Sequence, residues 1–187
     1  MARYDPKERL RYLEQLITEF QSTNSVDAKE QVLANLANFA YDPINYDHFR
    51  KLKIIELFLS QLEDENKTIQ EFAVGGICNL AADKSFVNEL EQLEGIPKLI
   101  TCLTSGREET VLSTITVLIF LASSGFGEDV TSRTVVESML KCADSSNKRL
   151  SNLAKVFLED ACSEDKVKQV KSLASNAECQ EVTLKNE

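Results

Sequence analysis

The stretch Gln70-Glu71-Phe72-Ala73-Val74-Gly75-Gly76-Ile77-Cys78-Asn79-Leu80-Ala81-Ala82-Asp83 decides the fold, because residues 29–42 carry the same pattern 41 positions earlier. Identical residues occur at 30/71, 38/79, 40/81 and 42/83, and apolar residues match at 32/73, 33/74, 36/77 and 39/80. The apolar spacing i, i+1, i+4, i+7, i+8 is one face of an α-helix. A helix that recurs at such a period predicts a stack of helical repeats.

Each repeat is expected to contain three helices. In the first repeat, Asp27 is expected to cap a long helix over 28–41, which Asp42-Pro43 ends. A short helix over 44–52 and a third helix over 54–62 follow. The second repeat keeps this plan, with identical residues at 52/93, 55/96 and 62/103 and with helices at 67–82, 86–93 and from Pro97 onward.

The later repeats are less regular. A strongly apolar helix is expected over 111–122, then a glycine-containing loop over 123–128 and a helix over 135–143. A partial fourth repeat begins near Asn147, and residues 166–174 are expected to add a last helix. We expect three regions: a capping helix within 1–26, a repeat domain over 27–162, and a terminal helix with a frayed polar tail over 163–187.

Several motifs resemble the armadillo repeat family. Leu93, Gly95, Ile96 and Pro97 resemble its turn between second and third helices, and Asn38-Phe39-Ala40 and Asn79-Leu80-Ala81 resemble the end of its third helix. The HEAT repeat, which has two helices, is the alternative. The resemblance implies an all-α, right-handed superhelical solenoid of about three full repeats plus capping helices.

Four segments resemble one short member of the armadillo family more closely, at 28–43, 71–80, 108–113 and 157–160. That resemblance implies a nuclear subunit of the minor spliceosome. It would pair with an RNA-recognition-motif protein near the capped end of a small nuclear RNA during pre-mRNA splicing. The implied partner is a protein, with RNA reached at most through the complex and with no membrane and no small-molecule substrate.

Charge and cysteine content limit the function classes. The net charge of −9 argues against general nucleic-acid binding, because phosphate contacts need a basic surface. Five cysteines without a Cys-x-x-Cys pair predict reduced thiols in an intracellular protein, at Cys78, Cys102, Cys142, Cys162 and Cys179. The first residues lack the apolar run of a signal peptide, and no stretch is expected to reach the length of a membrane span.

The polar side of the long helices is the candidate protein-binding surface. In armadillo proteins that bind extended peptides, an asparagine at the position of Asn38 and Asn79 holds the ligand backbone. A loop-capping role is an equal alternative for both residues. The tryptophan expected four residues earlier is replaced by Ala34 and Gly75, which argues against a general peptide groove. We predict a surface formed by Asn35, Asn38, Phe72, Gly75, Asn79, Thr116 and Phe120.

Two glycines in the middle of a helix also need an explanation. Gly75 and Gly76 each cost roughly 1 kcal/mol relative to alanine. Either a neighbouring helix or the backbone of a partner must therefore approach closely. Phe72 and Phe120 are either core residues or, if exposed, anchors for a partner.

Chemistry at a catalytic or metal site is not indicated. His48 has no nearby nucleophile motif, and neither a phosphate-binding loop nor metal-ligand spacing occurs. We expect a non-catalytic scaffold without a metal or a cofactor. The alternatives are a general peptide-binding adaptor and a protein that binds RNA directly through the basic cluster of Arg50, Lys51 and Lys53.

Overall fold

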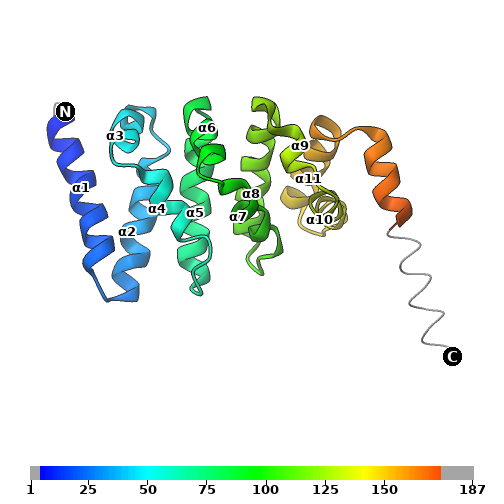
Figure 1. Cartoon of the computed structure of the whole chain (residues 1–187). Helices are drawn as coiled ribbons and strands as arrows, with labels where there is room; N and C mark the ends of the chain where they lie inside the picture. Colours follow the sequence, from blue (N-terminus) through cyan, green and yellow to red (C-terminus); the bar gives the residue numbers. More distant parts are fainter. Residues whose placement is uncertain (1–4, 174–187) are drawn as a thin grey trace. The chain divides into compact units, whose positions relative to one another are not determined.

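The computed structural model describes residues 5–173, and each regular element within this range is helical (Figure 1). The chain forms two compact units, Met1–Val117 and Leu118–Glu187. The all-α fold expected from the sequence is confirmed.

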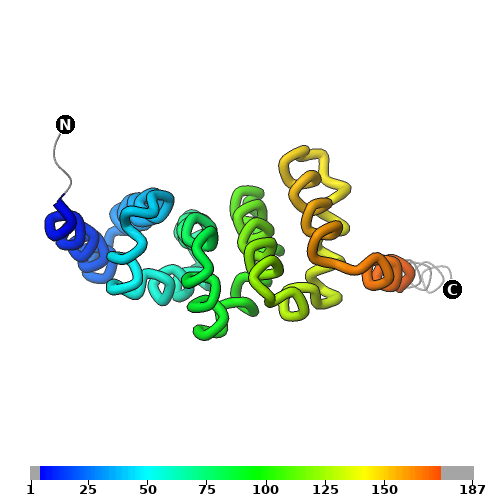
Figure 2. The backbone as a smooth tube through the Cα atoms, turned by 90° about the horizontal axis from the view of Figure 1, so that it is seen from above, coloured from blue at the N-terminus to red at the C-terminus, as the bar shows by residue number. Residues whose placement is uncertain are grey.

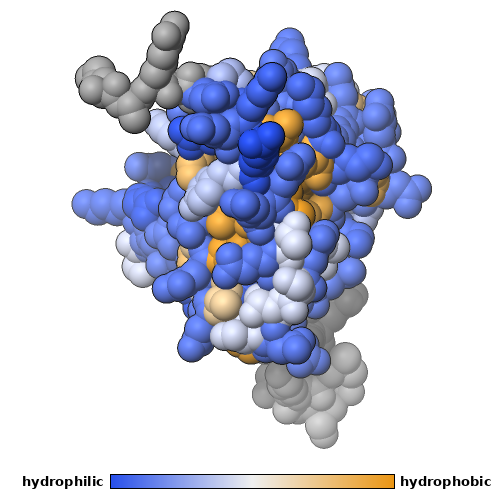
Figure 3. Space-filling view, turned by 90° about the vertical axis from the view of Figure 1, so that its left-hand side faces the viewer, coloured by the Kyte–Doolittle hydropathy of each residue, from blue (hydrophilic) through white to orange (hydrophobic). Residues whose placement is uncertain are grey.

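Helix α1 (Pro6–Ser22) covers one end of the first unit. The side chain of Asp5 accepts a hydrogen bond from the Lys7 amide at 2.8 Å, and Pro6 takes the first helical position, where its missing N–H costs nothing. Leu13, Leu16 and Phe20 are buried against the rest of the unit. The face seen from the α1 side is mostly hydrophilic (Figure 3). A terminal repeat needs such a face to stay soluble, and the boundary at residue 26 remains a prediction.

Helix α2 (Val26–Phe39) begins two residues before the sequence indicated. Ser25 is the N-cap, and its hydroxyl accepts from the Ala28 amide at 3.3 Å. The expectation that Asp27 caps this helix is wrong. Asp27 lies in the first turn, where its negative charge faces the positive end of the helix dipole.

The two repeats that follow share one plan. In the first, α2 leads into η1 (Pro43–Asn45), α3 (Tyr46–Lys51) and α4 (Ile54–Ser60). In the second, α5 (Lys67–Leu80) leads into α6 (Lys84–Gln92), α7 (Gly95–Thr101) and η2 (Cys102–Thr104). The expected three helices per repeat are therefore confirmed. Lys53 and Glu94, 41 residues apart, both have a φ of 53° in the turn before α4 or α7.

Side-chain bonds link neighbouring repeats at matching positions. Glu30 accepts from the Asn66 amide group at 2.7 Å, and Glu71 accepts from the Arg107 guanidinium at 2.6 Å. Each glutamate bonds a residue 36 positions ahead, just before the next long helix begins. This explains why glutamate is identical at 30 and 71.

Helix α8 (Glu108–Leu121) starts in the first unit and ends in the second. It belongs to a helical stretch of 23 residues, Glu108–Val130, whose most apolar 18-residue window has a mean hydropathy of 1.7 and is 44% buried. The expectation that no stretch reaches membrane-span length therefore needs correction. The stretch is not one straight helix, however, because Gly125 has a φ of 107° within the π-helical turn η3 (Ala122–Phe126). We interpret it as an apolar core helix with an irregular end.

One detail of this region differs from the sequence interpretation. Residues 123–128, expected as a loop, are helical and run through η3 into α9 (Gly127–Val130). Glycine and serine suggest a break, but one positive φ lets the chain turn within a helical path.

The second unit is completed by α10 (Arg133–Ala143), α11 (Lys148–Ala161) and helical residues 164–173. Asn147 caps α11, accepting from the amides of Arg149 and Leu150. The core of the second unit contains the buried residues Val135, Val136, Met139, Ala154 and Phe157. The predicted helix over 135–143 is confirmed, and the one over 166–174 is confirmed as far as residue 173, while residue 174, the polar tail at 177–187 and Cys179 lie outside the described residues.

Candidate protein-binding surface

The predicted surface starts from the long helices α2 and α5, which lie side by side in the first unit (Figures 1 and 2). Phe72, Gly75 and Asn79 follow one another at helical spacing on α5 and are half-buried. On α2, Asn35 and Asn38 are exposed. Asn38 matches Asn79 in the repeat, whereas Asn35 matches Gly76 and so lies one position away from this stripe.

The two adjacent glycines have different environments. A Cβ atom on Gly76 would lie under 3.0 Å from three carbons of the Phe58 ring, and Phe58 is fully buried. Close packing therefore explains Gly76. A Cβ atom on Gly75 would meet nothing within 4 Å. Packing within the described chain therefore gives no reason for Gly75.

A shallow hollow opens beside Phe72. It has a volume of about 420 Å³ and is lined by Asp27, Glu30, Gln31, Ala34 and Phe72. The first four residues come from α2 and Phe72 from α5. The sequence interpretation missed the α2 residues of this hollow, although the identical glutamates at 30 and 71 were a signal that could have found Glu30.

Asn79 links two repeats. Its side-chain amide donates to the backbone carbonyl of Ala37 at 2.9 Å, and its backbone carbonyl accepts from the Tyr46 hydroxyl at 3.2 Å. One donor of the Asn79 side chain is thus used at the end of α2. Ligand binding by Asn38 and Asn79 stays a prediction.

Thr116 and Phe120 lie one helical turn apart on α8, and both are half-buried. The Thr116 hydroxyl bonds the Leu112 carbonyl at 2.9 Å and also contacts the Cys78 thiol. Thr116 therefore adjoins α5 within the first unit. Phe120 belongs to the second unit.

Burial affects the described thiols, of which Cys78 adjoins this surface through Thr116. It raises the pKa of Cys78 to about 11, although the hydrogen bond with Thr116 acts in the opposite direction. Burial likewise raises the pKa of Cys102 and Cys142. The described cysteines are free, as expected, and a raised pKa leaves little reactive thiolate at neutral pH.

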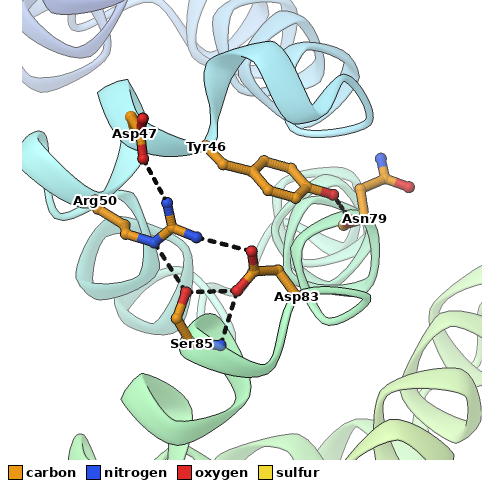
Figure 4. A network of polar contacts seen from close by, with 6 residues as sticks. All are labelled: Tyr46, Asp47, Arg50, Asn79, Asp83 and Ser85. Atoms are coloured by element: carbon orange, nitrogen blue, oxygen red, sulfur yellow. Dashed lines mark hydrogen bonds and ion pairs between the residues drawn. The ribbon is translucent and has the colours of Figure 1, made fainter.

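Arg50, the first residue of the predicted RNA-contact cluster, is bound within the protein (Figure 4). It donates to Asp47, Asp83 and Ser85, each at 2.8 Å, and its guanidinium lies 4.8 Å from the centre of the Phe86 ring. These contacts join α3 to the start of α6. Lys53 pairs with Glu56 at 3.0 Å, and Lys51 is exposed. The structure thus keeps Lys51 and Lys53 at the surface and gives Arg50 a role between repeats, while RNA contact stays a prediction.

Asp83 is the centre of this network. Burial alone would raise the pKa of Asp83, but hydrogen bonds from Ser85 and Arg50 outweigh it and hold the pKa below its ordinary value of 3.8. Asp83 also caps α6 by accepting from the Ser85 amide. Burial and the nearby Asp83 and Asp42 raise the pKa of Tyr46, whose hydroxyl bonds Asn79.

Within residues 5–173, no three His, Cys, Asp or Glu side chains come together as a group that could hold a metal ion. His48 is buried in α3. The residues that gather on the predicted surface are asparagine, phenylalanine, glycine and threonine. Such a surface can bind a partner through shape and hydrogen bonds.

Comparison with known proteins agrees with this geometry. A crystal structure of computationally designed armadillo repeat proteins for modular peptide recognition has a TM-score of 0.72 at 17% identity, over 83% of this chain and 69% of that one. A designed armadillo repeat protein in complex with the peptide (KR)4 has a TM-score of 0.67 at 17% identity, over 92% and 78% of the two chains. The fold is therefore that of an armadillo repeat scaffold.

A curated relative then identifies the family. Armadillo repeat-containing protein 7 of Mus musculus is 52% identical over 166 residues, which cover 88% of this chain and 84% of the relative. The chain belongs to the family of armadillo repeat-containing protein 7. No protein-family model matches it.

Proposed function

We propose that this protein is a non-catalytic scaffold that binds another protein on the surface around Phe72, Gly75 and Asn79. Gly75 carries the proposal. A glycine inside a helix lowers stability by about 1 kcal/mol relative to alanine, and no neighbour within the described chain occupies the space above it. The approach of a partner to Gly75 would explain why a side chain is absent there.

The fold supports a binding role. Two designed armadillo proteins of similar fold are described by their peptide recognition or by a bound peptide. Because their identity to this chain is low, they support a protein partner in general and not a particular one.

We further propose, from the kinship with armadillo repeat-containing protein 7, that the chain acts in the nucleus as a subunit of the minor spliceosome. Its partner would be an RNA-recognition-motif protein near the capped end of a small nuclear RNA. RNA would then be reached through the complex, since the net charge of −9 is unfavourable for phosphate binding by the chain alone.

The test is affinity purification of the tagged full chain from cells, followed by mass spectrometry and RNA sequencing. We expect a stoichiometric RNA-recognition-motif protein and one small nuclear RNA. Gly75→Arg should lose both without a lower unfolding midpoint, because arginine is a better helix former than glycine.

Gly106→Arg is the matched control. Like Gly75, Gly106 has nothing within 4 Å of an added Cβ atom, but it is exposed and lies in the loop before α8. This variant should keep the partner. Normal binding by Gly75→Arg would show that the binding surface is elsewhere, and recovery of no stoichiometric protein would contradict the scaffold role.

A further inference from the structure

The hollow beside Phe72 indicates what kind of group the partner presents. It combines two carboxylates of α2, Asp27 and Glu30, with the half-buried ring of Phe72 on α5. Ala34 lines it, and Gly75 follows Phe72 by one helical turn. Ala34 has a small side chain, and a Cβ atom on Gly75 would meet nothing within 4 Å.

We propose that this hollow receives one arginine side chain of the protein partner, with its guanidinium against Phe72 and between Asp27 and Glu30. The inference rests on the proposed scaffold function and names the chemistry of the bound group.

Charge complementarity is the first argument. The first unit contains 12 Lys and Arg residues and 19 Asp and Glu residues, a net charge of −7. Asp27 is exposed. One carboxylate oxygen of Glu30 accepts from Asn66, which leaves the other for a ligand. The nearby Arg107 interacts electrostatically with Glu30, but its guanidinium donates to Glu71, at 2.6 Å. A cation from a partner would therefore find carboxylate oxygens that the described contacts leave open.

The aromatic ring and the two carboxylates that line the hollow favour arginine over lysine. A planar guanidinium can stack on an aromatic ring and donate to two carboxylates at once, whereas an ammonium group is compact and more strongly hydrated. The protein itself shows this arrangement, since Arg50 lies over Phe86 and donates to both Asp47 and Asp83.

The surroundings also favour a single side chain over an extended peptide backbone. Asn79, which matches the backbone-binding asparagine of peptide-binding relatives, already donates to Ala37. The positions four residues before Asn38 and Asn79 hold Ala34 and Gly75, and the chain contains no tryptophan. Recognition would therefore depend on one anchor residue rather than on a long peptide.

The test is a titration of the ¹⁵N-labelled full chain with N-acetyl-arginine amide, followed by backbone amide chemical shifts. We expect saturable shifts that cluster at Gln31, Ala34, Phe72 and Gly75. N-acetyl-citrulline amide, which has nearly the same shape but no charge, should give no such shifts. N-acetyl-lysine amide should bind more weakly.

Two variants test the residues that form the hollow. Asp27→Asn combined with Glu30→Gln removes both charges and keeps an oxygen that can accept from Asn66, so the fold should persist. Arginine binding should weaken at least about tenfold, because charged hydrogen bonds are lost. Phe72→Leu should remove the preference for arginine over lysine. The control, Glu19→Gln combined with Glu91→Gln, removes two exposed charges elsewhere and should bind normally.

The outcomes separate the inference from the proposed function. Shifts spread over many acidic surfaces, equal shifts with citrulline, or normal binding by the Asp27/Glu30 variant would overturn the arginine site. If arginine fails to bind but Gly75→Arg still loses its protein partner, the scaffold function stands and only this inference fails.

Discussion

At the scale of single residues, the two adjacent glycines of α5 have different reasons to lack a side chain. Packing within the protein requires Gly76, whereas binding of a partner is the proposed reason for Gly75. Both lie in the same helix and share its backbone geometry. Gly76 is held against the Phe58 ring, while the position above Gly75 is open. Substituting each glycine by alanine therefore tests the difference directly.

We expect Gly76→Ala to lower the free energy of unfolding by about 1–3 kcal/mol, because the added methyl group overpacks a fully buried ring. Gly75→Ala should raise it by about 0.8–1 kcal/mol, because alanine is the better helix former. Urea denaturation of both variants measures the difference. If the two variants shift in the same direction, the assignment of roles is wrong.

Asp83 gives a residue-scale prediction on pH. Its pKa is held below 3.8 in the folded protein, so its contribution to stability is complete above its unfolded pKa and is lost as the pH falls through the folded pKa. Asp83→Asn keeps a capping side chain but loses the charge that pairs with Arg50 at 2.8 Å.

Asp83→Asn should have a lower free energy of unfolding than the wild type at pH 7. This difference in unfolding free energy should become smaller as the pH falls below 3.8. Denaturant unfolding between pH 7 and pH 3 measures it. A gap that stays constant over this range would mean that the charge of Asp83 contributes nothing.

At the scale of elements, the turn before α7 stores local strain. Glu94 has a φ of 53°, a left-handed conformation that costs a non-glycine residue about 1–2 kcal/mol. Glu94→Gly should raise the free energy of unfolding by about 0.5–1 kcal/mol, after the greater flexibility of the unfolded chain is subtracted. Glu94→Ile should lower it, because a β-branched residue fits this conformation poorly. Thermal unfolding of the two variants checks the sign of each.

Docking of α1 gives a second prediction at this scale. Leu13 is fully buried, whereas Gln15 on the same helix is exposed. Leu13→Ala should cost about 2–5 kcal/mol of unfolding free energy, and Gln15→Ala less than about 0.5 kcal/mol. A cost below 1 kcal/mol for Leu13→Ala would show that α1 contributes little to the first unit.

The elements were the most predictable part of the molecule. Apolar periodicity and the 41-residue offset placed the helices, because core positions repeat when the repeats pack alike. Boundaries were harder to place. Ser25 and Asp27 are both good caps, and only the path of the chain selects one of them. The helical turn through Gly125 could not be predicted, because a single positive φ leaves no pattern in the sequence.

The candidate site was less predictable. Gly75 stands out in a sequence because a helical glycine is costly, but its open surroundings appear only in the structure. Arg50 shows the opposite case. In the sequence it adjoins two lysines, yet three of its donors bond acceptors of the protein, at Asp47, Asp83 and Ser85. Such partners lie up to 35 residues away and cannot be read from local charge.

At the scale of the whole molecule, the charge balance separates protein binding from RNA binding. The net charge is −9, and within the predicted RNA-contact cluster Arg50 and Lys53 already pair with carboxylates. The isolated chain should bind a 20-nucleotide single-stranded RNA with a Kd weaker than about 100 µM at 0.15 M salt. Lys51→Glu with Lys53→Glu should change little.

Fluorescence anisotropy at several salt concentrations provides the measurement. Tight binding with a steep loss of affinity as salt rises, abolished by the double lysine variant, would restore direct RNA binding by this chain.

The matching bonds from Glu30 to Asn66 and from Glu71 to Arg107 have a consequence for how the first unit opens. Each bond ties one long helix to the residue that precedes the next. Fraying at the start of α5 therefore disturbs α2, and fraying at the start of α8 disturbs α5. Amide hydrogens in these helices should exchange with deuterium in shared, cooperative events rather than repeat by repeat. A destabilising substitution in one repeat would then also make the neighbouring repeat more susceptible to proteolysis.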